Sequence, residues 1–270
     1  KEEFYYKNIL PQKSIDEVRE DVEKWAQQRK AEIEQLQQNE AYRKDFLQNL
    51  SHELKTPIFA IQGYVDTLLN GALNNAEVNT KFLQSASHNI DRLVTLVADL
   101  DAISKLESGE QHLVMDNFII QDLVKEVFYS LAIKADEKHI KCEIKKGCEL
   151  PLTVYADKEK IRQVFINLID NAIKYGKINS IIEASFYKLD GANVLIEISD
   201  EGAGIAEEHL PRIFERFYRT DLARSRKIGG SGLGLSICKH IVEAHGQTIH
   251  VRSKIDVGST FGFTLQSKKP

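Results

Sequence analysis

The chain has 270 residues, which is enough for two domains or for one domain with a long helical extension. Apolar residues make up 42% and charged residues 28%, as in an ordinary globular protein, and the net charge of −4 argues against a nucleic-acid binder. No apolar run approaches the roughly 20 residues needed to span a bilayer.

The cysteines indicate neither a metal site nor a disulfide framework. Cys142, Cys148 and Cys238 have no metal-ligand spacing, and they fit a reducing compartment. We interpret them as small core or surface residues.

A long helical pattern begins after an irregular segment, residues 1–13. Ser14 and Glu17 form a capping-box arrangement at its start. The apolar spacing that follows is typical of a coiled-coil seam: Ile15, Val18, Val22, Trp25, then Ile33, Leu36, Leu47, Leu50 and Leu54. The interval of eleven residues between Val22 and Ile33 indicates a stutter, where a supercoil unwinds locally. We interpret this helix as a signalling coiled coil; the alternative is a solvated connector helix.

The stretch Ser51-His52-Glu53-Leu54-Lys55-Thr56-Pro57 lies within this helix. A neutral imidazole is a good nucleophile near neutral pH, and Glu53 is a candidate base for the proton of His52. Thr56 is four residues after His52, so it shares a helix face and could orient a water molecule. Because Leu50 and Leu54 continue the seam, we expect His52 to project outward. The alternative is an ordinary surface histidine; a His-Glu-x-x-His zinc site is excluded because position 56 is Thr.

A helical hairpin is expected around this stretch. The first helix should end near Asn70-Gly71, and a second should run from about Glu77 to Ser108, closed by Gly109. Its apolar positions repeat at 3-4-3-4-3 spacing: Leu83, Ala86, Ile90, Leu93, Val97 and Leu100. A hairpin cannot bury two such stripes alone, so we expect a homodimer that forms a four-helix bundle.

The composition changes after residue 109, since twelve of the 15 glycines lie at or beyond Gly147. Strands are expected at 115–120, 140–145, 152–156, 181–189, 194–199, 248–252 and 260–265. Helices are expected at 121–137, from a cap at Asp157 to Tyr175 with Gly176 beyond its end, and at 232–245. Asp190-Gly191 indicates a hairpin turn. This mixture suggests an α+β two-layer sandwich.

Two stretches of the second half suggest a site for a base and a metal ion. Asn167, Asn171 and Lys174 share one helix face, and an amide oxygen suits Mg²⁺; the alternative is a plain polar face. In Asp200-Glu-Gly202-Ala-Gly204 the carboxylate can accept from an adenine amine, and the glycines let the backbone approach a planar base. Alone, this second pattern is weak.

Two further stretches suggest phosphate recognition. Arg212-Ile-Phe214-Glu-Arg216-Phe217-Tyr-Arg219 mixes aromatic anchors with cations. Gly229-Gly230-Ser231-Gly232-Leu233-Gly234 opens a helix, whose N-terminal N–H groups can bind an anion. It matches neither the P-loop nor the Rossmann fingerprint. The polar loop 220–228 is interpreted as a mobile lid.

Together these motifs resemble those of bacterial sensor histidine kinases. Ser51 to Pro57 is similar to their H box, and the four later stretches are similar, in order, to the N, G1, F and G2 boxes of the GHKL ATPase type of catalytic domain. The resemblance covers about residues 40–266 and implies that ATP and Mg²⁺ bind the second half.

The resemblance also implies roles for single residues. His52 would be phosphorylated, with Glu53 as base and Thr56 serving phosphatase activity. Asn171 would be the Mg²⁺ ligand, supported by Asn167. The remaining ATP-binding residues would be Lys174 and Arg219 at the phosphates, Tyr175 and Asp200 at the adenine, Gly202 and Gly204 around the base, and Gly230, Gly232, Leu233 and Gly234 in the phosphate loop.

The fold implied begins with an all-α helical hairpin, which dimerises into a four-helix bundle and carries an N-terminal coiled coil. An α+β two-layer sandwich follows it. The expected domains are 1–39 (signalling helix), 40–110 (dimerisation and phosphotransfer) and 111–270 (ATP binding). The expected partner is a response-regulator receiver domain, docking near Phe59 to Tyr64. Because the chain starts at Lys1, we expect a cytoplasmic fragment of an inner-membrane-anchored bacterial sensor. Two other functions stay open: an ATPase clamp whose helices only dimerise, and a sensor that acts mainly as a phosphatase.

Overall fold

The computed structural model describes residues 15–107, 113–189, 192–220 and 230–268. The chain divides into two compact units, residues 1–52 and 53–270. The division falls inside the first helix, α1 (Ile15–Leu69), which is continuous through Pro57. The expected capping box at Ser14 lies outside the described residues.

The first unit consists, in its described part, of the N-terminal portion of α1. Four expected seam residues, Val22, Trp25, Ile33 and Leu36, are between 54% and 61% exposed. Large apolar side chains at coiled-coil spacing are normally covered by a partner helix. Their exposure in a single chain agrees with the interpretation as one strand of a coiled coil.

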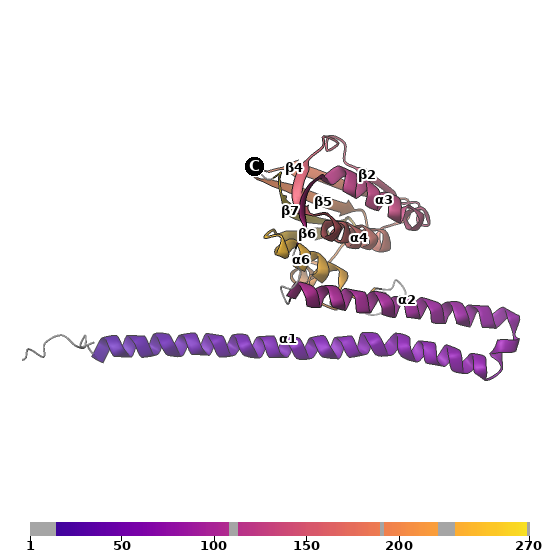
Figure 1. The fold of residues 1–270 in the computed structure, drawn as a ribbon, viewed down its shortest axis with the longest axis horizontal. Helices are drawn as coiled ribbons and strands as arrows, with labels where there is room; N and C mark the ends of the chain where they lie inside the picture. The colour runs from indigo at the N-terminus through magenta and orange to yellow at the C-terminus, as the bar shows by residue number, and fades with distance from the viewer. Residues whose placement is uncertain (1–14, 108–112, 190–191, 221–229, 269–270) are drawn as a thin grey trace, which may run out of the picture. The chain divides into compact units, whose positions relative to one another are not determined.

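In the helical hairpin, the first helix α1 ends at Leu69, next to the end predicted at Asn70-Gly71. After Leu69 the chain passes through Gly71, whose φ of +117° is left-handed, and a 3₁₀ turn η1 (Ala72–Asn74). The second helix α2 (Ala76–Glu107) then runs back along α1 (Figure 1). Its expected end at Gly109 lies outside the described part.

The rest of the chain contains three further α-helices among the described residues, together with a 3₁₀ segment and seven strands. Their bounds are β1 (Met115–Ile119), α3 (Ile120–Asp136), β2 (Lys141–Ile144), β3 (Thr153–Asp157), α4 (Lys158–Tyr175), β4 (Ile181–Lys188), β5 (Asn193–Asp200), η2 (Glu207–Arg212), α6 (Gly234–Ala244), β6 (Ile249–Lys254) and β7 (Gly258–Gln266).

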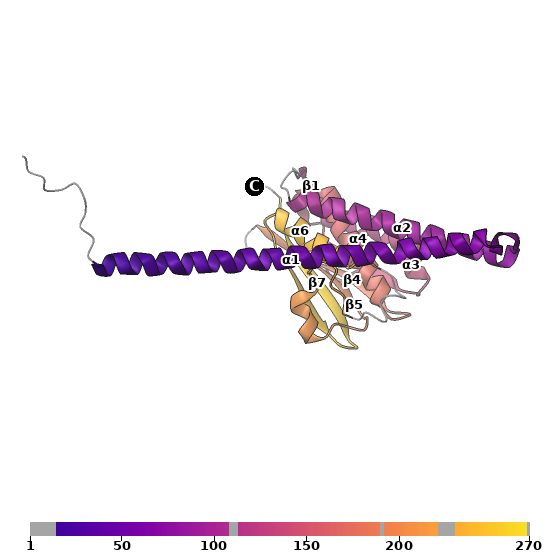
Figure 2. The same cartoon turned by 90° about the horizontal axis from the view of Figure 1, so that it is seen from below.

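These elements form the expected two-layer α+β sandwich. The five-stranded sheet has the order β2-β4-β5-β7-β6, in which only the β2–β4 pair is parallel. Figures 1 and 2 show α3, α4 and α6 packed along the sheet, where their apolar sides form one core with it. A separate antiparallel pair, β1–β3, stands beside this sheet.

The core follows from the two periodicities of the sequence. On β5, Val194, Ile196 and Ile198 alternate and are at most 1% exposed. The apolar face of α4 is equally buried: Ile161, Val164, Phe165, Leu168, Ile169 and Ala172. The opposite face of α4 is therefore available for a site.

The cap expected at Asp157 is confirmed. Its Oδ1 accepts hydrogen bonds from the backbone N–H groups of Glu159 and Lys160, both at 3.1 Å. The backbone N–H of Asp157 donates in turn to Nε2 of His245 at 3.0 Å, and Nδ1 of that ring donates to the carbonyl of Ile241 at 2.7 Å. The imidazole thus links the start of α4 to the end of α6.

One expectation about glycines is confirmed and one needs correction. Gly176 lies just beyond the end of α4, as expected, in an extended conformation (φ −63°, ψ 149°). Glycine is needed there for space, because a Cβ would lie 2.6 Å from the carbonyl oxygen of Ala172. The helix predicted from Gly232 begins at Gly234, since Gly230 and Gly232 have φ of +120° and +73°. The expected turn Asp190-Gly191 lies outside the described residues.

Candidate nucleotide pocket and phosphoacceptor turn

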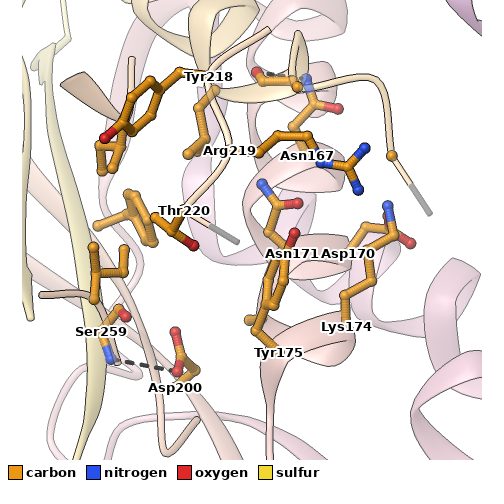
Figure 3. Close-up of a pocket in the computed structure, with 18 of the residues that line it drawn as sticks. Asn167, Asp170, Asn171, Lys174, Tyr175, Asp200, Tyr218, Arg219, Thr220 and Ser259 are labelled. Carbon is orange, nitrogen blue, oxygen red and sulfur yellow. Dashed lines mark hydrogen bonds and ion pairs between the residues drawn. The ribbon is translucent and has the colours of Figure 1, made fainter. Parts of the chain in front are cut away.

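A cavity of about 610 Å³ lies over the polar face of α4 (Figure 3), and this volume is typical of a small-ligand site. Its walls come from α2, α4, the end of β5, the segment 203–220, the glycine-rich stretch 230–235 and β7. Ten of the expected ATP-binding residues line it: Asn167, Asn171, Lys174, Tyr175, Asp200, Gly204, Arg219, Gly230, Gly232 and Gly234.

Two expected residues do not line the cavity. Leu233 is fully buried, so its side chain belongs to the core. Gly202 lies behind the wall, where a Cβ would come within 2.6 Å of the carbonyl oxygen of Tyr175 and 2.7 Å of Oδ1 of Asp200. Its lack of a side chain is what lets the loop after β5 close against α4. Most of the expected lid, residues 221–228, lies outside the described residues.

One end of the pocket is built around Asp200. Its Oδ1 accepts hydrogen bonds from the backbone N–H groups of Gly202 at 2.8 Å and Ser259 at 3.3 Å, and Figure 3 shows the contact with Ser259. Burial raises the pKa of this carboxyl, and the two N–H donors oppose the rise. The carboxylate is fixed through one oxygen, so the other can accept from a ligand.

Three apolar side chains to which the sequence gave no role also line the cavity. Ile205, Ile213 and Phe261 line the cavity together with Tyr175. Such walls suit a flat heteroaromatic ring. Ile213 lies inside the Arg212–Arg219 motif, which gave a hint, whereas Phe261 reads only as a strand residue.

The other end carries amides and cations. Figure 3 shows Asn167, Asn171 and Arg219 near one another, on the side away from Asp200. Nδ2 of Asn167 donates to the carbonyl of Gly234 at 3.3 Å, which ties α4 to the first residue of α6. Gly232 is constrained as well, because a Cβ there would come within 2.9 Å of the Phe217 backbone. These contacts bring three separate motifs to one place.

Asp170 is a pocket residue to which the sequence analysis gave no role. Its carboxylate pairs with Nζ of Lys134 and Nζ of Lys174, both at 2.7 Å. Burial alone would raise its pKa, but hydrogen bonds from the two lysines hold the pKa below its ordinary value. Lys174 is thereby fixed on the pocket wall.

Helix α2 also reaches the pocket, which no sequence pattern indicated. Thr95 and Asp99, one turn apart, line the cavity. Oδ2 of Asp99 accepts a hydrogen bond from Oγ of Ser231 at 3.0 Å, and Leu96 and Ile103 of α2 join the buried core. Burial raises the pKa of Asp99 despite this hydrogen bond.

The candidate phosphoacceptor turn, Ser51–Pro57, lies within α1. His52 and Thr56 are exposed, whereas Leu50 and Leu54 are partly buried, so the outward orientation expected for His52 is confirmed. Leu47 of the same seam is 51% exposed. The carboxylate of Glu53 pairs across the hairpin with the guanidinium of Arg92 at 2.7 Å.

The donor set fits a hard cation held together with phosphates. Among the described residues no group of three or more His, Cys, Asp or Glu side chains could hold a metal ion by itself. Amide oxygens at Asn167 and Asn171 instead match Mg²⁺, which keeps waters and phosphate oxygens as its other ligands.

The three cysteines are free thiols, and burial raises the pKa of Cys238 to about 12 and that of Cys142 to about 11.

Comparison with known families decides what this arrangement is. Residues 42–109 match the model of the His Kinase A phospho-acceptor domain, and residues 156–269 match that of the histidine kinase-, DNA gyrase B- and HSP90-like ATPase. The chain belongs to the sensor histidine kinase family. Its ATP-binding domain is therefore the α+β sandwich that contains the pocket.

Two similar proteins are named as sensor or sensor-like histidine kinases. It is 38% identical over 226 residues to the sensor-like histidine kinase SenX3 of Mycobacterium tuberculosis, covering 84% of this chain and 54% of SenX3. It is 35% identical over 228 residues to the sensor histidine kinase WalK of Bacillus subtilis, covering 84% of this chain and 37% of WalK. The chain thus spans about half the length of SenX3, or less in the case of WalK.

Solved structures of histidine kinases share the fold. The Acinetobacter baumannii histidine kinase AdeS aligns with a TM-score of 0.66 and 27% identity, over 81% of this chain and 98% of AdeS. ShkA in complex with AMPPNP aligns at 0.63 and 28%, over 84% of this chain and 47% of ShkA. ThkA in complex with the response regulator TrrA aligns at 0.66 and 25%, over 83% of this chain and 61% of ThkA.

In the part of this kinase chain that the structure describes, no helix combines the length and the apolar character needed to cross a membrane.

Proposed function

We propose that this chain is a protein histidine kinase that transfers the γ-phosphoryl group of ATP to His52 and then to an aspartate of a response-regulator receiver domain. The observation that carries the proposal is the pocket itself. A half-buried carboxylate, Asp200, lies at one end, and the amides of α4 with the cations of Lys174 and Arg219 lie at the other, in a chain that exposes His52 on a separate helix.

The two ends of the pocket divide the recognition of ATP. Asp200 accepts from the adenine amine, while Tyr175 and the apolar side chains hold the ring. Lys174 and Arg219 neutralise phosphate charge, and Gly230, Gly232 and Gly234 allow the backbone of the loop to approach the phosphates. Leu233 contributes by anchoring that loop in the core, where it is fully buried.

A magnesium ion would be held by the side-chain oxygen of Asn171, with Asn167 in support. The ion would neutralise charge on the phosphate oxygens. Asn167 also fixes the start of α6 through its hydrogen bond to Gly234.

In the transfer step, one ring nitrogen of neutral His52 attacks the γ-phosphorus in line. The N–P bond forms as the bond to the bridging oxygen breaks, and ADP leaves with that electron pair. The proton on the other ring nitrogen passes to Glu53. Catalysis is mostly positioning and charge neutralisation, as in phosphoryl transfer generally.

We also propose that the active form is a homodimer, with domains at about 1–39, 40–110 and 111–270. Leu83, Ile90 and Val97 repeat every seven residues on α2 and are 49–57% exposed, as expected of a stripe covered by a second copy.

The receiver domain would dock near Phe59 to Tyr64, where Phe59 is 63% exposed. ThkA, a structural neighbour, is solved with its response regulator. Thr56 would orient the water that removes the phosphoryl group from the regulator.

The test is incubation of the chain with γ-labelled ATP and Mg²⁺. We expect a label that is acid-labile and base-stable, absent from His52→Gln and retained by His88→Gln, a control at another exposed histidine. ATP turnover without a stable phosphoprotein would support the clamp alternative instead. A chain that labels poorly but rapidly dephosphorylates a receiver domain would support the phosphatase alternative.

A further inference from the structure

The base expected beside His52 has a partner from the other helix of the hairpin. Nη2 of Arg92 donates to Oε2 of Glu53 at 2.7 Å. The two residues are 39 positions apart in the sequence, so only the packing of α2 on α1 brings them together.

This ion pair differs from the other ion pairs of the hairpin. The side chains of Arg92 and Glu53 are 29% and 26% exposed, whereas those of Lys105 and Asp101, the next pair along α2, are 53% and 60% exposed. Exposed pairs contribute little because water and entropy compete with them. A partly shielded, charge-assisted contact between two helices holds its groups in place more firmly.

Helix geometry explains why Glu53 needs such a restraint. His52 and Glu53 are consecutive, and consecutive side chains on a helix point about 100° apart, so they do not face each other by default. A carboxylate that must take a proton from the neighbouring imidazole has to be directed toward it. The contact with Arg92 uses Oε2, and Oε1 is the second acceptor of the same group.

We propose that Arg92 is a positioning residue for the phosphorylation of His52. Arg92 holds Glu53 through Oε2, and Oε1 takes the imidazole proton while the N–P bond forms and ADP leaves. Arg92 stays a cation throughout and touches neither ATP nor phosphorus. The arrangement follows the general logic of a nucleophile, its base and a third group that orients the base. It rests on the proposed kinase function.

The experiment is a double-mutant cycle on single-turnover autophosphorylation. We expect Arg92→Gln to slow labelling of His52 about tenfold, part of the roughly 10²–10⁴-fold that a positioned base supplies. The KM for ATP should stay unchanged, and Arg92→Lys should recover part of the rate. In a Glu53→Gln background, Arg92→Gln should have no further effect, because Arg92 acts only through Glu53.

Lys105→Gln, which removes an exposed cation from the same helix, is the matched control and should label normally. Equal fractional losses from Arg92→Gln in both backgrounds would overturn the proposal, since a structural role would slow both. If Arg92→Gln does not fold, Arg92→Lys is compared in the two backgrounds, because lysine lacks the planar fork of arginine. A wild-type chain without label on His52 refutes the kinase function, whereas normal labelling by Arg92→Gln refutes only this inference.

Discussion

At the scale of single residues, Asp200 is the group on which nucleotide choice should depend. Its Oδ1 is held by the backbone N–H groups of Gly202 and Ser259. The sequence offered Asp200 only as part of a common Asp-x-Gly-x-Gly turn. The structure adds that the carboxylate is half-buried and held in one direction, because the N–H of Ser259 comes from β7, 59 residues away. No local pattern can reveal that contact.

Replacement of Asp200 by Asn should weaken ATP binding. With its oxygen on the N–H groups of Gly202 and Ser259, the Asn side chain would present an NH2 donor in place of the carboxylate oxygen that accepts from the adenine amine. Hydrogen bonds to charged groups are worth about 1.5–3 kcal/mol, which corresponds to roughly 10- to 100-fold in Kd. Calorimetric titration with ATP and GTP measures this effect. Discrimination between the two bases should fall together with ATP affinity, and an Asn variant that still prefers ATP as strongly as wild type would contradict the assignment.

His245 should make stability sensitive to acid. Burial lowers its pKa below the ordinary 6.5, although the hydrogen bond to the carbonyl of Ile241 and the nearby carboxylate of Asp157 oppose the fall. The unprotonated Nε2 accepts a hydrogen bond from the backbone N–H of Asp157. The unfolded state therefore binds more protons, so this contribution to stability is complete above about pH 6.5 and is lost as the pH falls through the lowered pKa of the folded state. Urea unfolding at pH 7.5 and 5.5 should show a smaller acid loss for His245→Gln than for wild type.

His240 acts in the same direction, since burial and the nearby Arg216 also lower its pKa. Some acid sensitivity should therefore persist in His245→Gln. An unchanged difference between the two pH values in that variant would show that His245 is not coupled to folding.

At the scale of elements, α2 places a carboxylate beside the glycine-rich stretch, where we propose that the phosphates of ATP bind. Asp99 lines the cavity and accepts from Ser231 of the glycine-rich stretch. The sequence predicted α2 and its seam but not this contact, because residues 99 and 231 meet only through tertiary packing. The glycine-rich motif itself was predictable. The predicted start of α6, Gly232, lies two residues before the observed start at Gly234, because the left-handed backbone at Gly232 cannot be inferred from composition.

Asp99→Ala should strengthen ATP binding about fivefold. Removing a negative charge near the triphosphate gains roughly 1 kcal/mol at the effective dielectric of a partly buried site. Asp101→Ala is the control, since Asp101 pairs with exposed Lys105 and does not line the cavity. Weaker ATP binding in Asp99→Ala, measured by fluorescence titration, would mean that the α2 contact supports nucleotide binding.

At the scale of the whole molecule, the exposed stripe of α2 makes a dimer the expected state. Ile90→Asp should shift the chain toward monomer, because a buried charge at the centre of a bundle seam is costly unless it is paired. Sedimentation velocity measures the shift. His88→Asp, on the opposite side of α2, should leave the dimer intact. Equal behaviour of the two variants would place the dimer contact elsewhere.

Much of this architecture could be predicted, since helix and strand periodicities determine which faces are buried. The outward His52, the cap at Asp157 and ten pocket residues follow from local motifs. Asp170, Phe261 and the α2 side chains do not, because their roles depend on partners distant in sequence. The position of Gly176 just beyond α4 was predicted, but the reason that a glycine is needed there was not, since its small size serves packing against Ala172.

The most direct test of the account measures ATP affinity and phosphohistidine formation in the same samples of wild type, His52→Gln and Asn171→Ala. His52→Gln should bind ATP with wild-type affinity and form no phosphohistidine, because the pocket is intact and only the acceptor is gone. Asn171→Ala should keep the acceptor and lose labelling. Phosphohistidine in His52→Gln at the wild-type level would contradict the assignment of His52 as the acceptor.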